Sequence, residues 1–209
     1  MKRNNAIQLC IIFLLMVTEV HGEDQTAIIF PLKGRLYMIN ALPPGPLPSN
    51  TVRSKTGEVW MDRNLGASQV ATAINDGLSY GDLYQWGRLT DGHEKREPLS
   101  GTTVDLATSH IPGHDKFILS SGNDWLETPN DSLWLGVYGI NNPCPAGFRL
   151  PTKTEWQNEI DAYGTSGTAL FESVLKLPAA GYRLVGIGPN SGKLMYEETR
   201  GTYWSRTPV

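Results

Sequence analysis

The amino-acid sequence predicts a domain of the α+β class, in which short helices and short strands are joined by long turns. Three observations favour this class. One helix has a well-defined start at Thr152, several apolar stretches of strand length are bounded by glycine, proline or asparagine, and the long stretch 89–142 lacks periodicity. The 22 glycines and 14 prolines among 209 residues also favour turns over a helical bundle.

The chain is expected to begin with a cleaved export signal. Lys2 and Arg3 precede an apolar run over 6–17, and small or permissive residues stand at 20–22. The run is about 12 residues long, whereas a membrane-spanning helix needs roughly 20. We therefore expect cleavage near Gly22, giving a secreted, periplasmic or cell-surface protein with no transmembrane span in the mature chain. An uncleaved membrane anchor is the alternative.

The residues after this signal, 23–50, are predicted to form an extension of the core domain. Strand candidates lie at 27–30 and, with a weaker pattern, at 35–39. A proline-rich stretch at 43–49 follows, and its missing backbone donors favour an extended linker. The compact domain is therefore expected to span 51–209.

The first elements of this domain are short. A half-buried strand is predicted at 57–62, where apolar and polar residues alternate before Asn64 and Gly66. A helical turn is compatible with the small residues at 67–73. The stretch 80–88 has apolar residues at helical spacing before a glycine, which predicts a short helix, with an aromatic strand as the alternative.

The stretch 89–142 is far longer than the roughly 12–15 residues usual for a loop in a compact domain. Insertions of this kind often carry binding surfaces, so we expect it to lie outside the core as the working surface. Trp125 and Trp134 should tether it, and they are also the tryptophans best placed to stack on a sugar ring. The neighbouring oxygen-bearing side chains that would contribute to a ligand site are Asn123, Asp124, Glu127 and Asn130.

Metal sites are a second interpretation of the same stretch. His110, His114 and Asp115 are candidate transition-metal ligands, with His93 as a further one, although the intervening proline and glycine exclude a helical spacing. Oxygen-rich turns are candidate calcium ligands, and they lie at 76–77, 122–124 and 127–131. The alternative is ordinary surface histidines and polar turns, with no cofactor required.

The stretch 141–156 contains the clearest local signal in the chain. Its prolines and glycine disfavour a helix until Thr152, and Glu155 follows three residues later, which is the pattern of a capping box. The helix should run over 152–163, end at Gly164 and turn Trp156 towards a mostly antiparallel sheet. A second helix is predicted at 168–176, hairpin strands from 177 onward, and a last strand at 203–205.

Cys144 is the cysteine that remains if the signal containing Cys10 is removed. An odd thiol in an oxidising compartment is either a small buried hydrophobe or the partner of a cysteine outside this chain. Two flanking prolines and the lack of a nearby histidine argue against a nucleophile.

Six sequence blocks in the same order resemble the Fibrobacter succinogenes major paralogous domain, a family of bacterial secreted proteins. They are VWMDRNLG at 59–66, YQWG at 84–87, CPAGFRLPT at 144–152, EW at 155–156, LPAAG at 177–181 and YWS at 203–205. The run 148–156 is also similar to the helix start of the formylglycine-generating sulfatase-modifying enzymes. That similarity implies a C-type lectin-like fold, in which the structural residues are Cys144, Arg149, Thr152, Glu155 and Trp156.

The chain differs from this family after its YWS block. Family members continue to a closing strand that ends in valine, arginine and cysteine, and nothing here corresponds to it. The resemblance therefore implies a truncated or divergent member whose sheet lacks an edge strand and whose Cys144 lacks its partner. Formylglycine chemistry requires reactive cysteines late in the chain, so that activity is not implied.

The leading functional hypothesis is a non-catalytic secreted or cell-surface module that binds carbohydrate or a surface protein through 89–142. A net charge of −3 and the lack of a basic run argue against nucleic acid as a partner. The first alternative is a metal-dependent enzyme related to the sulfatase-modifying factors, using His110, His114 and Asp115. The second is a structural surface protein with no small ligand.

Overall fold

The computed structural model describes residues 27–32, 35–40, 47–97, 101–122 and 124–208, and the predicted export signal and Asn123 lie outside these ranges. The chain divides into two compact units, Met1–Pro48 and Ser49–Val209. Among the described residues, no helix combines the length and the apolar character that crossing a membrane requires.

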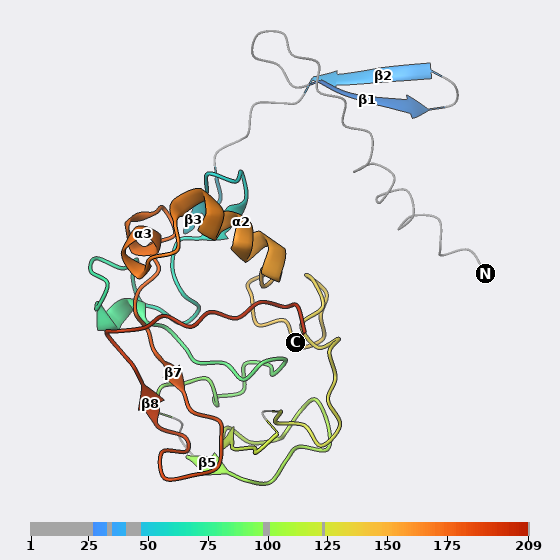
Figure 1. Ribbon diagram of the computed structural model, residues 1–209. Helices are drawn as coiled ribbons and strands as arrows, with labels where there is room; N and C mark the ends of the chain where they lie inside the picture. Colours follow the sequence, from blue (N-terminus) through green and yellow to red (C-terminus); the bar gives the residue numbers. More distant parts are fainter. Residues whose placement is uncertain (1–26, 33–34, 41–46, 98–100, 123, 209) are drawn as a thin grey trace, which may run out of the picture. The chain divides into compact units, whose positions relative to one another are not determined.

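The first unit contains an antiparallel pair of strands. β1 (Ala27–Leu32) pairs with β2 (Arg35–Asn40), and Ile29 lies opposite Met38 (Figure 1). The strand predictions at 27–30 and 35–39 are therefore confirmed.

The second unit is built from short elements, which confirms a mixed α+β composition. Its 3₁₀ helix is η1 (Gly77–Ser79). Its strand pairs are β3 (Thr51–Arg53) with β4 (Val59–Met61), β5 (Thr102–Thr103) with β6 (Phe117–Ile118), and β7 (Tyr182–Arg183) with β8 (Leu194–Met195). The β5–β6 pair is parallel and the other two pairs are antiparallel. Within the described residues, each sheet consists of two strands.

The helix α2 (Lys153–Tyr163) begins and ends where the sequence predicts. The Thr152 hydroxyl accepts a hydrogen bond from the Glu155 backbone N–H at 3.1 Å, and the Glu155 carboxylate accepts one from the Thr152 N–H at 2.7 Å. Arg149 adds two bonds to the same carboxylate, at 2.8 and 2.6 Å. Gly164 ends the helix at a φ of 110°, which favours glycine. The capping box therefore has an arginine as a third partner.

This arrangement makes the stability of the second unit dependent on pH. The Arg149 hydrogen bonds, opposed by partial burial, lower the pKa of Glu155 from 4.5 to about 2. Because the pKa falls on folding, the stabilisation is complete above pH 4.5 and is lost as the pH falls towards 2. Replacing Glu155 with glutamine keeps a capping side chain but removes the charge, so it should lower the free energy of unfolding by about 1 kcal/mol at pH 7.

Urea unfolding of the variant and the unmodified chain at several pH values tests this. The difference between them should shrink as the pH falls below 4.5. Glu172→Gln is the matched control, because Glu172 is exposed at the end of a helix, and it should change stability little at any pH. An equal loss for Glu155→Gln at neutral and strongly acid pH would contradict the explanation.

The helix α3 (Gly167–Glu172) is shorter than the predicted 168–176. It starts where the Ser166 hydroxyl accepts the Ala169 N–H at 3.0 Å. It ends because the Ser173 hydroxyl donates to the Leu170 carbonyl at 2.7 Å and accepts the Leu175 N–H at 3.1 Å, replacing the next helical turn. In Figure 1, α2 and α3 lie together at one end of the second unit and β5 lies at the other.

Two helix predictions in the first half of this unit are wrong. Residues 67–73 and 80–88 are irregular, and the helical turn nearby is instead η1, where the Asp76 carboxylate accepts the Leu78 N–H. At the start of 80–88, Gly81 has a φ of +68°, and a Cβ there would lie 2.3 Å from the Leu65 carbonyl oxygen. This close approach explains why apolar residues at helical spacing do not form a helix here.

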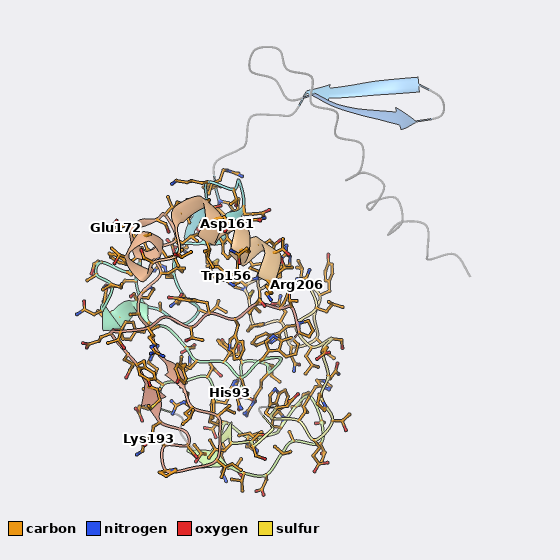
Figure 2. All side chains as sticks on the ribbon, viewed as in Figure 1. His93, Trp156, Asp161, Glu172, Lys193 and Arg206 are labelled. Carbon is orange, nitrogen blue, oxygen red and sulfur yellow. The ribbon has the colours of Figure 1, made fainter. Side chains whose placement is uncertain are left out.

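The strand predicted at 203–205 is also absent. Indole groups occupy the carbonyls that a neighbouring strand would use, because Trp156 Nε1 donates to the Trp204 carbonyl at 2.9 Å and Trp86 Nε1 donates to the Ser205 carbonyl at 2.8 Å. Trp156 also packs against Trp60, with ring centroids 4.9 Å apart. Figure 2 places Trp156 on the side of α2 that faces the rest of the unit. The described residues form separate two-stranded pairs there, and not the mostly antiparallel sheet that was expected to pack against Trp156.

The expectation that 89–142 lies outside the core is wrong. Trp125 and Trp134 are only 2% and 1% exposed, and their indole N–H groups donate to the Trp86 and Arg88 carbonyls at 2.8 and 3.1 Å. The main buried cluster consists of Ala107, Ile118, Trp125, Leu126 and Leu133, all from this stretch. The two tryptophans do tether the stretch, but as part of the core, where almost none of either side chain is accessible at the surface.

Candidate functional site

A buried arginine connects the stretch 85–91 to the stretch 114–116. Arg88 has no exposed surface. Its guanidinium donates to Asp91 Oδ2 and Gln85 Oε1, both at 2.9 Å, and to the carbonyls of Lys116 and His114 at 2.9 and 2.8 Å. Burial lowers the pKa of Arg88, and the Asp91 carboxylate opposes that effect. A planar guanidinium can satisfy these diverging acceptors together, which a lysine cannot.

His93 lies fully buried beside this arginine network, and Figure 2 shows it in the interior of the second unit. Its Nδ1 is 2.7 Å from Asp91 Oδ1, and its Nε2 accepts the Gln85 backbone N–H at 3.1 Å. Because Nε2 is an acceptor, Nδ1 carries the proton and donates to Asp91. Burial lowers the pKa of His93, so the ring is neutral at pH 7.

One cluster among the described residues has side chains that can act as metal ligands. It consists of Asp91, His93 and Glu94. One ligand atom from each lies within 4.8 Å of the others, so the three residues could hold a metal ion. A metal on Nδ1 would displace its proton while Nε2 still faces a backbone N–H, so either the ring or Gln85 would have to move. Of these three residues, His93 could be proposed as a ligand from the sequence, whereas Asp91 and Glu94 could not.

The predicted metal ligands His110, His114 and Asp115 do not come together in the described part of the chain, where the ligand cluster is the one at 91–94. His114 Nδ1 accepts the Lys116 N–H at 3.2 Å, and its carbonyl accepts from Arg88. The His110 carbonyl accepts from Asn141 at 3.1 Å. The two histidines therefore contribute mainly backbone acceptors to the interior.

Two of the predicted ligand-binding polar residues, Asp124 and Asn130, form turns. Asp124 Oδ1 accepts the Leu126 N–H at 2.9 Å, and Asn130 Oδ1 accepts the Ser132 N–H at 3.0 Å, both two residues along the chain. This is the turn-forming alternative considered for such residues. Glu127 is exposed. Binding of calcium at these turns stays a prediction.

An exposed group of apolar side chains, not predicted from the sequence, lies within the same stretch. Tyr138 is 97% exposed, Ile140 67%, Leu135 59% and Val137 38%. We call these four residues, Leu135, Val137, Tyr138 and Ile140, the apolar tip. The signal for it was the sequence LGVYGI, in which apolar residues alternate with glycine inside a polar region.

Two asparagines hold the base of the apolar tip. The Asn141 N–H donates to the Leu133 carbonyl at 3.0 Å, closing the loop, and its side chain donates to the Gly87 carbonyl at 2.8 Å. The Asn142 side chain donates to the carbonyls of Val137 and Phe148 at 3.2 and 2.9 Å. Gly139 is required here, because a Cβ would lie 2.8 Å from the Leu135 backbone nitrogen. The tip is thus an ordered loop on a buried base.

A cavity of about 500 Å³ lies within the second unit. Its aromatic walls include Trp60, Tyr84, Trp86, Trp156, Tyr203 and Trp204. Most of these rings are half-buried, and Trp204 is 46% exposed. Neighbouring rings contact one another, since the Trp156 and Tyr203 centroids lie 5.8 Å apart. These aromatic residues therefore both pack against one another and line the cavity.

Cys144 is free and lines this cavity. Burial raises the pKa of its thiol to about 11, so the thiol is protonated at neutral pH. A protonated thiol is a poor nucleophile and a poor metal ligand. Cys144 is therefore a half-buried, uncharged part of the cavity wall.

Comparisons with protein-family models, with curated proteins and with solved structures found no match.

Proposed function

We propose that the second unit is a non-catalytic binding module of an exported protein, and that it recognises a protein partner through the apolar tip. The observation that carries the proposal is the exposure of Tyr138, at 97%, beside Ile140, at 67%. A tyrosine supplies a large contact area at a low cost in conformational entropy, and tyrosine is enriched among residues that dominate interface energies.

The charges next to the apolar tip in the sequence favour a protein partner over a membrane surface. Between 126 and 143 the charged residues are Glu127 and Asp131, both exposed, with no lysine or arginine. Two negative charges oppose binding to anionic lipids. A carbohydrate partner is less favoured because both tryptophans of the stretch are turned into the core. The partner that fits best has an apolar pocket with basic side chains at its rim.

Fold and compartment belong to the same proposal. The C-type lectin-like fold is supported by the capping box at the position that the resemblance implies, with Arg149, Thr152, Glu155 and Trp156 in structural roles. Export is supported by the sequence pattern of residues 1–22. Membership of the Fibrobacter major paralogous domain family is supported by the six blocks over 57–207, and it would make the protein a bacterial surface module.

One observation favours a second candidate function, a metal-dependent enzyme. It is the cluster of Asp91, His93 and Glu94, of which only His93 was considered from the sequence. Metal analysis of the full chain, purified without chelators, separates the two functions. A stoichiometric transition metal would favour the enzyme.

The binding proposal is tested with the double variant Tyr138→Ser, Ile140→Ser. A partner captured from the cell envelope or culture medium is purified, and its affinity for the full chain is measured by calorimetry. The variant should bind at least 30-fold more weakly, because two exposed anchors are removed. Glu127→Lys should also slow association with a partner that has a basic rim.

The control variant is Ile187→Ser, which removes an isoleucine of similar exposure, 63%, outside the apolar tip. It should bind as tightly as the unmodified chain. Equal binding by the double variant would refute the role of the tip. Tip-dependent binding to a glycan or to anionic vesicles, with no protein partner, would refute the choice of a protein.

A further inference from the structure

The aromatic cavity is a second site, independent of the apolar tip, since none of the tip residues lines it. We propose that this cavity binds an uncharged molecule with flat aromatic rings, which pack against the accessible tryptophan rings of its walls. Such binding requires neither the apolar tip nor its protein partner.

The cavity gathers all six tryptophans of the chain. Its volume of about 500 Å³ falls within the roughly 300–1,000 Å³ typical of small-molecule sites. Trp125 and Trp134 are buried. The other four retain accessible surface, and they are Trp60, Trp86, Trp156 and Trp204. A molecule in the cavity therefore meets mainly aromatic surface.

Neighbouring rings of the walls are tilted against each other. The Trp60 and Trp156 planes differ by 40°, with centroids 4.9 Å apart, and the Trp156 and Tyr203 planes differ by 50°, with centroids 5.8 Å apart. Aromatic pairs prefer offset or edge-to-face arrangements at about 4.5–7 Å between centroids. Tilted walls allow a flat ring to make both kinds of contact, whereas an aliphatic chain gains only the burial of its surface.

The polar ends of the same tryptophans are already engaged. All six indole N–H groups donate to acceptors within the protein. Trp60 Nε1 donates to Glu159 Oε1 at 3.0 Å, for example, and Trp204 Nε1 donates to the Tyr84 carbonyl at 2.8 Å. A sugar would have to replace the water around its hydroxyl groups, and these indoles offer it no donors. The walls therefore favour an aromatic ligand over a carbohydrate.

The charged side chains of the walls are balanced within the protein. Three form ion pairs, and the pairs are Arg63 with Asp62, Arg149 with Glu155, and Asp82 with Lys95. The fourth, Arg183, donates to the Gly192 and Lys95 carbonyls. Burial lowers the pKa of Arg183, and the carboxylates of Glu97 and Glu197 oppose that effect. A charged ligand would lose hydration without meeting an unmatched opposite charge, so the ligand should be uncharged.

The test compares two fluorescent probes on the unmodified full chain. They are N-phenylnaphthylamine, which is uncharged, and the matching anilinonaphthalenesulfonate, which has the same rings and an added sulfonate. The amine should bind saturably, with a stoichiometry of one, and at least tenfold more tightly than the sulfonate. Lack of saturable amine binding, or equal or tighter binding of the sulfonate, would overturn the proposal. Displacement of the amine by cellotriose would assign the ring faces to carbohydrate and overturn it as well.

Two variants place the bound amine in the cavity. Trp204→Leu removes an accessible ring from the wall and Cys144→Phe fills part of the space, so each should weaken binding at least fivefold. Tyr196→Leu is the matched control, because Tyr196 is 45% exposed, against 46% for Trp204, and does not line the cavity. It should bind the amine as tightly as the unmodified chain. Unchanged binding by Trp204→Leu and Cys144→Phe would also overturn the proposal. If circular dichroism shows that one of them does not fold, the other variant and the probe comparison still decide.

Discussion

Replacement of Arg88 with methionine is expected to lower the free energy of unfolding by about 3–5 kcal/mol, because it removes one partner of a buried ion pair. Arg88 is 0% exposed. Without it, Asp91 keeps its charge in the interior, and the carbonyls of Lys116 and His114 lose their donors. Methionine fills much of the same volume, so the expected loss comes mainly from unsatisfied polar groups. Urea unfolding at pH 7, followed by circular dichroism, measures it.

Two further variants make the result specific. Arg88→Lys should recover little of the lost stability, because an ammonium cannot reach acceptors in four directions. Arg53→Met also removes an arginine that donates to a carbonyl, but at an exposed position, and it should change stability by less than about 0.5 kcal/mol. If Arg88→Met lost no more than Arg53→Met, Arg88 would not be the connection between 85–91 and 114–116.

Elements with a strong local signal could be predicted from the sequence. The helix α2 is the clearest case, since Thr152 and Glu155 are three residues apart and Gly164 stands at its end. These signals act within a few residues of the chain, so they do not depend on the rest of the fold. The strands β1 and β2 have similar local patterns of apolar residues between turn-forming residues.

The interior position of 89–142 depends on contacts between distant residues, so it could not be predicted in this way. The Gln85 side-chain amide pairs with both backbone groups of Ile118, which is 33 residues away. The Trp125 indole reaches the Trp86 carbonyl over 39 residues, and Asn141 reaches the Gly87 carbonyl over 54. Polar side chains take the place of strand neighbours here, and no periodicity marks them in advance.

The candidate sites were missed for a related reason. Residue type identified His93 as a possible ligand, but only the fold shows that the Gln85 N–H engages its Nε2. The stretch 89–142 was predicted to lie outside the core, with Trp125 and Trp134 as the tryptophans best placed to stack on a sugar, and the burial of both indoles contradicts this. Trp125 and Trp134 are buried, whereas the four residues of the apolar tip, which stand next to Gly136 or Gly139, are exposed.

Replacement of Trp134 with alanine tests this assignment most directly. Its side chain is 1% exposed, lies 5.7 Å from the Trp86 ring between centroids, and donates to the Arg88 carbonyl at 3.1 Å. Removing a buried tryptophan should lower the free energy of unfolding by about 3–5 kcal/mol. Chemical denaturation of the full chain gives the value.

Tyr138→Ala is the matched control, since Tyr138 lies four residues further along the same loop and is 97% exposed. It should change stability by less than about 0.5 kcal/mol while weakening partner binding. The two substitutions should thus separate stability from recognition within one loop. A Trp134→Ala variant that unfolds like the unmodified chain would place the indole at the surface, and the tryptophans would again be the better candidates for ligand contact.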